Sequence, residues 1–321
     1  MDYRRCGNSG IELPILSLGM WHNFGDVDNF STARSMVLTA FDNGLCHFDL
    51  ANNYGPSPGS AEITLGRILQ GDLNSHRDEL FISTKAGHTM WPGVYGGNSS
   101  RKNLIASCNA SLKRAKLDYF DIFYTHRYDG VTPIEETAQA LIDLVHSGKA
   151  LYVGVSKYPA EQQQQMYKLL SEANVPCLAS QYRYSMFDRS AADENFQLAV
   201  DNNSGIVVFS PLAQGLLTNK YFNGIPDNSR AAKSTGFLQV EQVTEAKVEA
   251  ARKLNVIAES RGQTLAQMAL AWILTDKRVT SVIIGASSSS QLKSNLGVLN
   301  SPEFTDDELN AIQAIINNIP E

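Results

Sequence analysis

Residues 45–55 of the chain read LCHFDLANNYG. The apolar residues on either side of Asp49 predict a buried strand, and the polar residues after Ala51 predict a turn that ends at Gly55. Two interpretations of this stretch compete. Asn and Gly are common turn residues, so it is either an ordinary strand and turn or a strand end that carries Asp49 and Tyr54 into a chemical site.

Runs of the same kind recur and predict eight strands in all, at residues 13–19, 45–51, 80–86, 119–126, 151–156, 177–182, 205–210 and 279–285. Amphipathic segments with the spacing of half-buried helices lie between most of them, as in NLIASCNASLKRAKL at residues 103–117. Alternating strands and helices are typical of a parallel sheet with right-handed crossovers. Eight such units predict an α/β fold of the (β/α)8 TIM barrel type.

Three segments lie outside this repeat. Residues 3–14 predict an N-terminal β-hairpin around Gly7–Gly10 that closes the barrel floor. Residues 87–100 and residues 211–243, after the third and seventh strands, form long loops, and loops of this length are usually functional or disordered. No linker or low-complexity tract interrupts the chain, so residues 1–321 are predicted to form a single domain.

Composition narrows the class of protein. The 321 residues are 43% hydrophobic and carry a net charge of −6 with scattered Lys and Arg, which argues against nucleic acid or a membrane as partner. No apolar run is long enough to span a bilayer, and the polar N-terminus does not resemble a signal peptide. The four cysteines form no CxxC pair, which favours reduced thiols over zinc or disulfides. We expect a cytoplasmic metabolic enzyme without a metal site.

The carboxyl ends of the strands form the active face of a TIM barrel, and here they hold polar residues of several kinds. Asp49 and Tyr54 follow the second predicted strand. Lys85 ends the third, and His126 ends the fourth. Each alone has an ordinary explanation as a turn residue or a packed side chain. A carboxylate, a phenol, an ammonium and an imidazole at one barrel mouth favour catalysis.

These groups suit proton donation to a carbonyl oxygen. Asp49 is expected to pair with Lys85, and the Lys85 ammonium to lower the pKa of Tyr54 from about 10. Tyr54 would then act as a general acid toward a developing alkoxide, while His126 donates a hydrogen bond to the same oxygen. The chain contains no HExxH, GxSxG, P-loop or GxGxxG pattern, so a hydrolase, a kinase and a Rossmann dehydrogenase have little support.

On these residues the chain resembles the aldo-keto reductases, from about Arg5 to about Leu299. FDLANNYG supplies an Asp and a Tyr, STKAG a Lys and YTHR a His, in the order of that family's catalytic tetrad. Within this family the chain looks closest to the potassium-channel β-subunit-like branch, which includes bacterial L-glyceraldehyde 3-phosphate reductases. Five stretches carry this likeness: SLGMWHNFG (17–25), NNYGPSPGSAE (52–62), MWPGVYGG (90–97), SRKNL (100–104) and PLAQGLLTNKYFNGIP (211–226). The resemblance implies four catalytic residues, Asp49, Tyr54, Lys85 and His126.

The resemblance also implies NADPH or NADP+ bound in an extended form across the barrel mouth. Around the nicotinamide it implies Trp21, Asp49, Ser156, Gln181 and a stacking Phe209. For the rest of the cofactor it implies Ser210, Leu212, Gln214, Gly215, Lys220, Arg230, Gly285, Ser287, Gln291 and Asn295. Lys220 and Arg230 would supply positive charge for the 2′-phosphate, and the long loop that carries them would act as a lid. Lys157 stands where many family members carry Asn.

The function expected from this resemblance is NADPH-dependent reduction of small aldehydes, such as L-glyceraldehyde 3-phosphate or methylglyoxal, to alcohols. The nicotinamide C4 supplies the hydride and Tyr54 the proton. Trp21, Trp91 and Tyr95 would wall the substrate pocket, and Arg127 would either attract a substrate phosphate or form a structural ion pair. Two alternatives stay open: a cofactor-binding regulatory β-subunit of a membrane channel or other partner, and an alcohol dehydrogenase that uses NAD. Relatives in the branch imply a homotetramer or a larger homo-oligomer.

Overall fold

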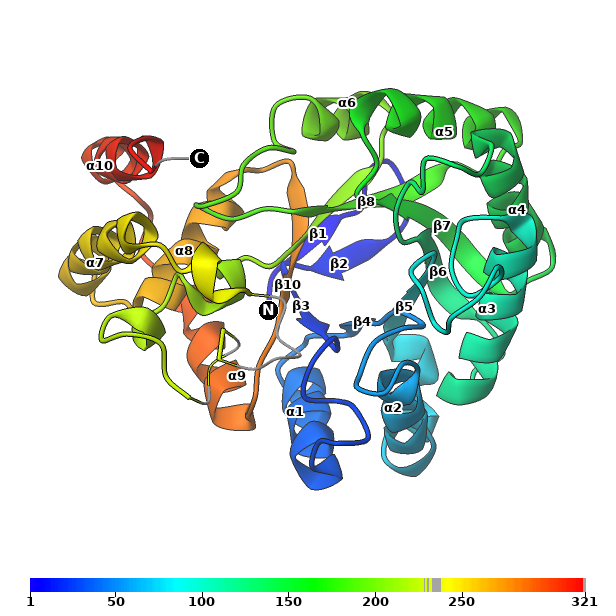
Figure 1. Cartoon of the computed structure of the whole chain (residues 1–321), viewed down its shortest axis with the longest axis horizontal. Helices are drawn as coiled ribbons and strands as arrows, with labels where there is room; N and C mark the ends of the chain where they lie inside the picture. Colours follow the sequence, from blue (N-terminus) through cyan, green and yellow to red (C-terminus); the bar gives the residue numbers. More distant parts are fainter. Residues whose placement is uncertain (228, 230, 233–237, 320–321) are drawn as a thin grey trace. The chain divides into compact units, whose positions relative to one another are not determined.

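Eight parallel strands close into a barrel in the computed structural model of the chain, which describes residues 1–227, 229, 231–232 and 238–319. The order around the barrel is β10, β3, β4, β5, β6, β7, β8 and β9 (Figure 1). Their bounds are β3 Leu16–Gly19, β4 His47–Asp49, β5 Phe81–Ala86, β6 Phe120–Thr125, β7 Ala150–Ser156, β8 Cys177–Arg183, β9 Gly205–Phe209 and β10 Val279–Ile284. The predicted TIM barrel is confirmed.

The chain divides into two compact units, and the first contains the whole closed barrel. It comprises Met1–Tyr182, Ala191–Phe209 and Arg278–Leu292. Its helices lie outside the strands (Figure 1): α1 Phe30–Asp42, α2 Ser60–Gly71, α3 Arg101–Ala115, α4 Ile134–His146, α5 Ala160–Glu172 and α6 Asn195–Asp201, with the 3-10 helix η1 Asn74–Glu79. The helix predicted within residues 103–117 is confirmed as part of α3, which buries Leu104, Cys108 and Ala115.

The strands form where they do because both of their faces are covered. All six residues of β6, FDIFYT, are buried, and so are all six of β5, FISTKA. Strands covered on both sides usually read as apolar runs, and β6 is mostly apolar, whereas Ser83, Thr84 and Lys85 make half of β5 polar. The polar residues buried within these runs are the exceptions, and several of them, including Lys85, lie on the site described below.

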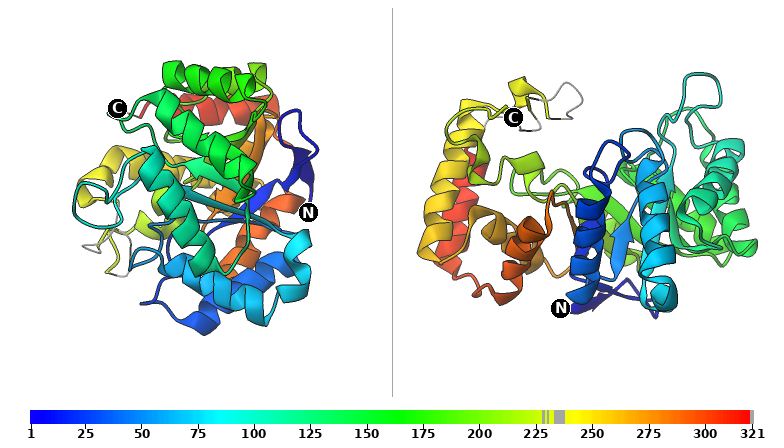
Figure 2. Two further views of the ribbon diagram at one scale, coloured as in Figure 1. Left: turned by 90° about the vertical axis from the view of Figure 1, so that its right-hand side faces the viewer. Right: turned by 90° about the horizontal axis from the view of Figure 1, so that it is seen from below.

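The predicted N-terminal hairpin is confirmed at the barrel floor. Strands β1 Tyr3–Arg5 and β2 Glu12–Pro14 pair antiparallel, so the first barrel strand begins after Pro14 and not at residue 13 as predicted. The Arg4 guanidinium donates to the Val279 carbonyl at 2.5 Å, at the start of β10. Figure 2 shows the hairpin at one end of the barrel and the 87–100 loop at the other. The hairpin covers the end of the barrel at which the strands begin, so a functional site has room only at the other end, where the strands finish.

The second unit is helical and has its own core. It comprises Arg183–Ser190, Ser210–Lys277 and Lys293–Glu321. Its helices are α7 Glu245–Ser260, α8 Leu265–Thr275 and α10 Asp306–Asn317, with the 3-10 helix η5 Gly297–Asn300, and α9 Ser289–Leu296 runs from the first unit into it. Residues such as Leu254, Met268 and Ile312 are buried together. No helix in the described part of the chain is both long and apolar enough to cross a membrane.

The two long loops differ in content. Residues 87–100 contain no helix or strand, as predicted. Within residues 211–243 the structure describes three short 3-10 helices, η2 Ala213–Gly215, η3 Asn219–Tyr221 and η4 Val240–Gln242. Side chains from this segment, among them Leu216, Tyr221 and Leu238, form a small buried cluster. The segment therefore has local structure that its weak sequence periodicity did not reveal.

Candidate active site

The carboxyl ends of β4, β5 and β6 bring the four candidate residues into one region of the first unit. Asp49 ends β4 and lies opposite Ser83 of β5, and Lys85 of β5 lies opposite Tyr124 of β6. His126 follows β6 directly, and its amide donates to the Ala86 carbonyl at 2.8 Å. Because parallel strands of a barrel all end on the same side, residues far apart in sequence meet here.

The turn after β4 places Tyr54. The Asn52 amide donates to the Lys85 carbonyl at 2.8 Å, and the Tyr54 amide donates to the Ala51 carbonyl at 3.0 Å. Gly55 then adopts a φ of 80°, where a Cβ atom would also lie 2.4 Å from the Ser60 hydroxyl. The chain thus reverses tightly enough to return the Tyr54 ring to the strand ends.

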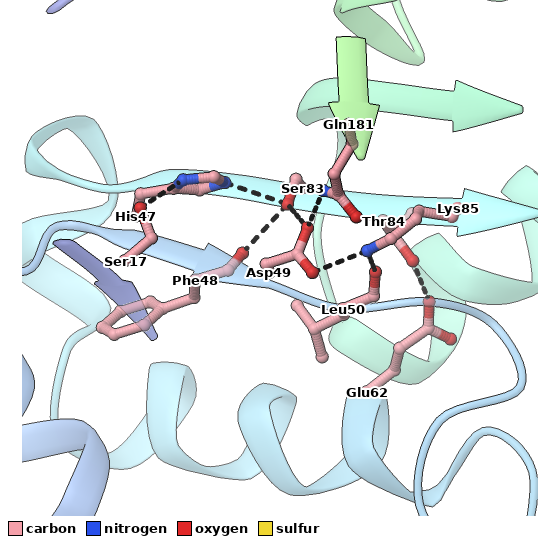
Figure 3. Close-up of polar contacts among 10 residues, drawn as sticks. All are labelled: Ser17, His47, Phe48, Asp49, Leu50, Glu62, Ser83, Thr84, Lys85 and Gln181. Carbon is pink, nitrogen blue, oxygen red and sulfur yellow. Dashed lines mark hydrogen bonds and ion pairs between the residues drawn. The ribbon is translucent and has the colours of Figure 1, made fainter. Parts of the chain in front are cut away.

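Asp49 and Lys85 form a buried ion pair (Figure 3). Lys85 Nζ lies 2.7 Å from Asp49 Oδ2 and also donates to the Leu50 carbonyl at 2.5 Å. Asp49 Oδ1 accepts from Ser83 Oγ at 2.8 Å and from Gln181 Nε2 at 2.9 Å. Burial lowers the pKa of Lys85, an effect that the charges of Asp49 and Glu62 oppose. The predicted Asp49–Lys85 pairing is present.

The Tyr54 ring is surrounded by three of these predicted groups. Its centroid lies 4.9 Å from Lys85 Nζ, 5.8 Å from the His126 ring centroid and 6.2 Å from that of Trp21. Burial raises the pKa of Tyr54 well above 10, and the Asp49 carboxylate adds to the rise. The expectation that the pKa of Tyr54 lies below 10 is wrong, because desolvation of the buried phenolate raises it. The Tyr54 hydroxyl is therefore protonated at neutral pH.

His126 is a neutral imidazole in this setting. Only 5% of it is exposed, and its Nδ1 is buried without a hydrogen-bond partner among the described residues. Burial lowers its pKa well below 6.5, and Lys85, Lys157, His88 and Arg127 add to the decrease. A neutral imidazole can donate one hydrogen bond, and because it carries no charge it does not compete with Lys85 for the Asp49 carboxylate.

Sequence reasoning missed His88, which lies next to His126, and the contact that Lys157 makes with His88. The His88 ring lies perpendicular to that of His126, with centroids 4.3 Å apart, and His88 Nε2 lies 2.9 Å from Lys157 Nζ. Burial together with Lys157 and Arg127 lowers the pKa of His88 to about 4, so this imidazole accepts from the ammonium. A left-handed backbone at Lys157, with φ of 54°, follows the end of β7. Both residues follow the carboxyl end of a strand, His88 after β5 and Lys157 after β7, and this position could have marked them as candidates for the site.

The predicted substrate-pocket residues do not all lie together. Trp21 lies against Tyr54, as stated above, and the Arg127 guanidinium donates to the Gly87 carbonyl at 3.4 Å. Trp91 and Tyr95 are 51% and 58% exposed in the 87–100 loop. Lys102 Nζ lies over the Tyr95 ring at 4.7 Å. The structure therefore places Trp21 beside Tyr54 and leaves Trp91 and Tyr95 largely open to solvent.

The residues expected around a nicotinamide fit such a group in part. Ser156 Oγ, at the end of β7, is buried and has no hydrogen-bond partner among the described residues, so it is ready to bind a carboxamide. Gln181 Nε2 already donates a hydrogen bond to Asp49 Oδ1. Phe209 is partly buried at the end of β9. Beyond Gly285, the Ser287 amide and hydroxyl donate to Gln291 Oε1 at 2.7 and 2.9 Å.

The second unit holds the other expected cofactor residues. Ser210, Gln214 and Gly215 have positive φ angles, so the backbone after β9 turns sharply beside Leu212. Gln214 Oε1 and Asn295 Nδ2 are buried without hydrogen-bond partners among the described residues, which suits a polar ligand. Lys220 lies in the exposed part of η3. Arg230, the second predicted phosphate contact, lies outside the described residues.

Comparisons with known proteins show the family of the chain. The sequence profile of the aldo/keto reductase family matches residues 15–317. L-glyceraldehyde 3-phosphate reductases of Escherichia coli O157:H7 and Escherichia coli K12 are each 52% identical over 313 residues, covering 96% of this chain and 90% of the relative. A probable voltage-gated potassium channel subunit beta of Arabidopsis thaliana is 34% identical over 328 residues, covering 100% of this chain and 98% of the relative.

Proposed function

The chain belongs to the aldo/keto reductase family and is an oxidoreductase, and from this premise we propose that it reduces small aldehydes with NADPH. We propose L-glyceraldehyde 3-phosphate as the main substrate and methylglyoxal as a secondary one. The observation that carries the proposal is the Tyr54 ring held beside His126 and the buried Asp49–Lys85 pair. This is the set of groups that a carbonyl reduction needs at the oxygen atom.

Tyr54 is the proposed general acid. When bound, NADPH supplies a hydride to the carbonyl carbon, and Tyr54 gives its proton to the carbonyl oxygen. The raised pKa of Tyr54 keeps this proton in place until negative charge develops on the oxygen. The Lys85 ammonium, 4.9 Å from the ring centroid, then stabilises the tyrosinate until water restores the proton. His126 donates a hydrogen bond to the same carbonyl oxygen and so fixes its position.

Several residues are proposed to hold the cofactor. Ser156 Oγ offers an unused buried hydrogen-bonding group for the nicotinamide carboxamide, and Gln181 and Trp21 complete that end. Gln214 and Asn295, each with an unused buried polar atom, are assigned to the other half. Lys220 and Arg230 are assigned to the 2′-phosphate, which would make NADPH preferred over NADH.

A phosphate on the substrate would meet positive charge at the ends of β6 and β7. The charges of Lys157 and Arg127 add to the effect of burial in lowering the pKa of His88. Lys157 Nζ lies 2.9 Å from His88 Nε2, and the His88 ring lies 4.3 Å from the His126 ring. A triose phosphate whose carbonyl oxygen reaches His126 would therefore place its phosphate near these cations. This arrangement supports a phosphorylated substrate over methylglyoxal.

A second candidate function is a cofactor-binding regulatory β-subunit of a membrane channel or other partner. Its support is the 34% identity to a protein named as a probable voltage-gated potassium channel subunit beta. The presence of both Tyr54 and His126 in the chain favours catalysis over a purely regulatory role. A homotetramer or larger homo-oligomer in the cytoplasm remains part of the proposal.

Two measurements on the purified chain test these assignments. Fluorescence titration should show NADPH binding at least about tenfold tighter than NADH, because only NADPH presents a 2′-phosphate. Equal binding would remove Lys220 and Arg230 as phosphate contacts and would favour the NAD-dependent alternative. A panel of L- and D-glyceraldehyde 3-phosphate, methylglyoxal and nitrobenzaldehyde should give the highest kcat/KM with the L-triose phosphate. No turnover of any aldehyde would favour the regulatory subunit.

A further inference from the structure

A line of buried polar side chains runs from the barrel floor to Asp49, and the proposed reaction uses only its last member. Ser17, His47, Ser83 and Ser281 are each 0% exposed, and Asp49 is 2% exposed. These residues come from the neighbouring strands β10, β3, β4 and β5 (Figure 3 shows the part from Ser17 to Asp49). Such a line of polar groups in a barrel interior is costly unless every group is hydrogen-bonded.

Five contacts make up this line. They are Ser281 Oγ to the Pro14 carbonyl at 2.6 Å, Ser17 Oγ to Ser281 Oγ at 2.6 Å, Ser17 Oγ to His47 Nδ1 at 2.7 Å, His47 Nε2 to Ser83 Oγ at 3.0 Å, and Ser83 Oγ to Asp49 Oδ1 at 2.8 Å. Both ends of the line, a carbonyl oxygen and an ionised carboxylate, are acceptors only.

The line has one hydrogen too few. Each serine hydroxyl brings one hydrogen and a neutral imidazole brings one, so four hydrogens serve five contacts. His47 is neutral near pH 7, because burial and the Lys85 charge lower its pKa to about 4 while Asp49 opposes them. One contact therefore lacks a hydrogen. The imidazole nitrogen that carries the hydrogen decides which half of the line contains that contact.

The Asp49 charge settles this choice. A hydrogen bond to an ionised acceptor is about twice as strong as one between neutral groups, so the Ser83 hydroxyl turns to Asp49. Ser83 Oγ then accepts from Nε2–H of His47, and His47 Nδ1 accepts from Ser17. The contact without a hydrogen falls at Ser281, next to the floor and away from Asp49.

We propose that His47, with its hydrogen on Nε2, is a positioning residue that acts through Ser83 to hold Asp49 in the orientation that pairs with Lys85. Ser83 and Gln181 hold Oδ1, which leaves Oδ2 for the ammonium. If the Ser83 bond is lost, Gln181 alone holds Oδ1, so the carboxylate is less firmly oriented, and Lys85 Nζ moves with it relative to Tyr54. This inference rests on the proposed function, since Asp49, Lys85 and Tyr54 must carry the reaction for their orientation to matter.

Two serine variants test the line with matched loss of a buried hydroxyl. Ser83→Ala should lower kcat on the order of 10-fold, with the KM for NADPH and for the aldehyde changed less than about threefold. Ser180→Ala removes an equally buried hydroxyl, bonded to the Tyr167 hydroxyl at 2.6 Å, and should leave kcat near wild type. Equal kcat in the two variants would overturn the proposal, because a structural role alone predicts equal effects.

Two variants of His47 distinguish a hydrogen-bond donor at the place of Nε2 from one at the place of Nδ1. The amide nitrogen of glutamine reaches the place of Nε2, whereas that of asparagine reaches the place of Nδ1. His47→Gln should therefore keep the donor to Ser83 and retain a kcat on the order of 10-fold above that of His47→Asn. An equal kcat in both variants would overturn the proposal, as would a higher kcat for His47→Asn.

Nitrogen NMR of labelled histidine gives a result that does not depend on turnover. The proposal requires the hydrogen of His47 on Nε2 near pH 7 in the wild-type protein. A hydrogen on Nδ1 would overturn it, whatever the activities. If the wild-type protein reduces no aldehyde, the proposed function fails on that result alone, and the NMR measurement still decides the state of His47.

Discussion

Replacement of Lys85 by methionine isolates the contribution of the buried ion pair to stability. Lys85 Nζ lies 2.7 Å from Asp49 Oδ2, and the two side chains are 0% and 3% exposed. Methionine fills much of the same space but removes the ammonium, which leaves the carboxylate with Ser83 and Gln181 as donors. Breaking a buried pair on one side costs about 3–5 kcal/mol, and since two donors remain we expect about 3 kcal/mol.

The free energy of unfolding from urea titration near pH 7, followed by tryptophan fluorescence, measures this loss. Adding Asp49→Asn to Lys85→Met removes the stranded charge and should restore part of the lost stability. Arg34→Ala, which opens an exposed pair with Asp72, should lower stability far less because water screens that pair. If Lys85→Met costs no more than Arg34→Ala, or if the double variant is less stable than Lys85→Met, the reasoning about a stranded buried carboxylate is refuted.

Three further outcomes follow from named contacts. The pKa of His47 falls from 6.5 to about 4 on folding, so the unfolded state binds more protons in that interval, and stability should decrease as pH falls from about 6.5 to about 4. His47 alone contributes about 3 kcal/mol to this decrease, and urea midpoints that do not change across the window would contradict it. Lys157→Met should raise the KM for L-glyceraldehyde 3-phosphate on the order of 10-fold and change that for methylglyoxal little; equal changes would remove Lys157 as a phosphate contact. Gly66→Ala should destabilise by about 1–3 kcal/mol, because a Cβ there lies 2.6 Å from the Arg114 carbonyl oxygen, whereas Gly71→Ala meets nothing within 4 Å and should be neutral or stabilising. Thermal unfolding of both glycine variants checks the last pair, and similar melting temperatures would contradict the close approach.

Strand positions were predictable because each strand is covered on both faces. The six buried residues of β6, for example, appear in the sequence as an apolar run apart from Asp121 and Thr125. The convergence of Asp49, Lys85 and His126 followed from the rule that parallel strands end on one side of a barrel. The hairpin at residues 3–14 followed from its glycines. Each of these features could be predicted because a short stretch of sequence is enough to determine it.

The remaining features depend on surroundings that no local pattern contains. The sequence shows that Lys85 and Asp49 approach Tyr54 but not that burial, to which the Asp49 charge adds, raises the pKa of Tyr54. Lys157 has a left-handed backbone and contacts His88, and neither feature follows from the sequence around it. Residues 47 and 49 of a strand point to the same side, so alternation in the strand was a signal for His47 near Asp49 that sequence reasoning missed. Only the structure showed the Ser83 hydroxyl that connects them.

The central claim is that Tyr54 supplies the proton in aldehyde reduction, and Tyr54→Phe tests it most directly. The variant keeps the ring between Trp21 and His126 and removes only the hydroxyl. We predict that turnover of the best aldehyde substrate falls at least about 100-fold, while the affinity for NADPH, measured by fluorescence titration of the same preparation, changes less than about twofold. Turnover near the wild-type rate would contradict the account, because another group would then be the general acid.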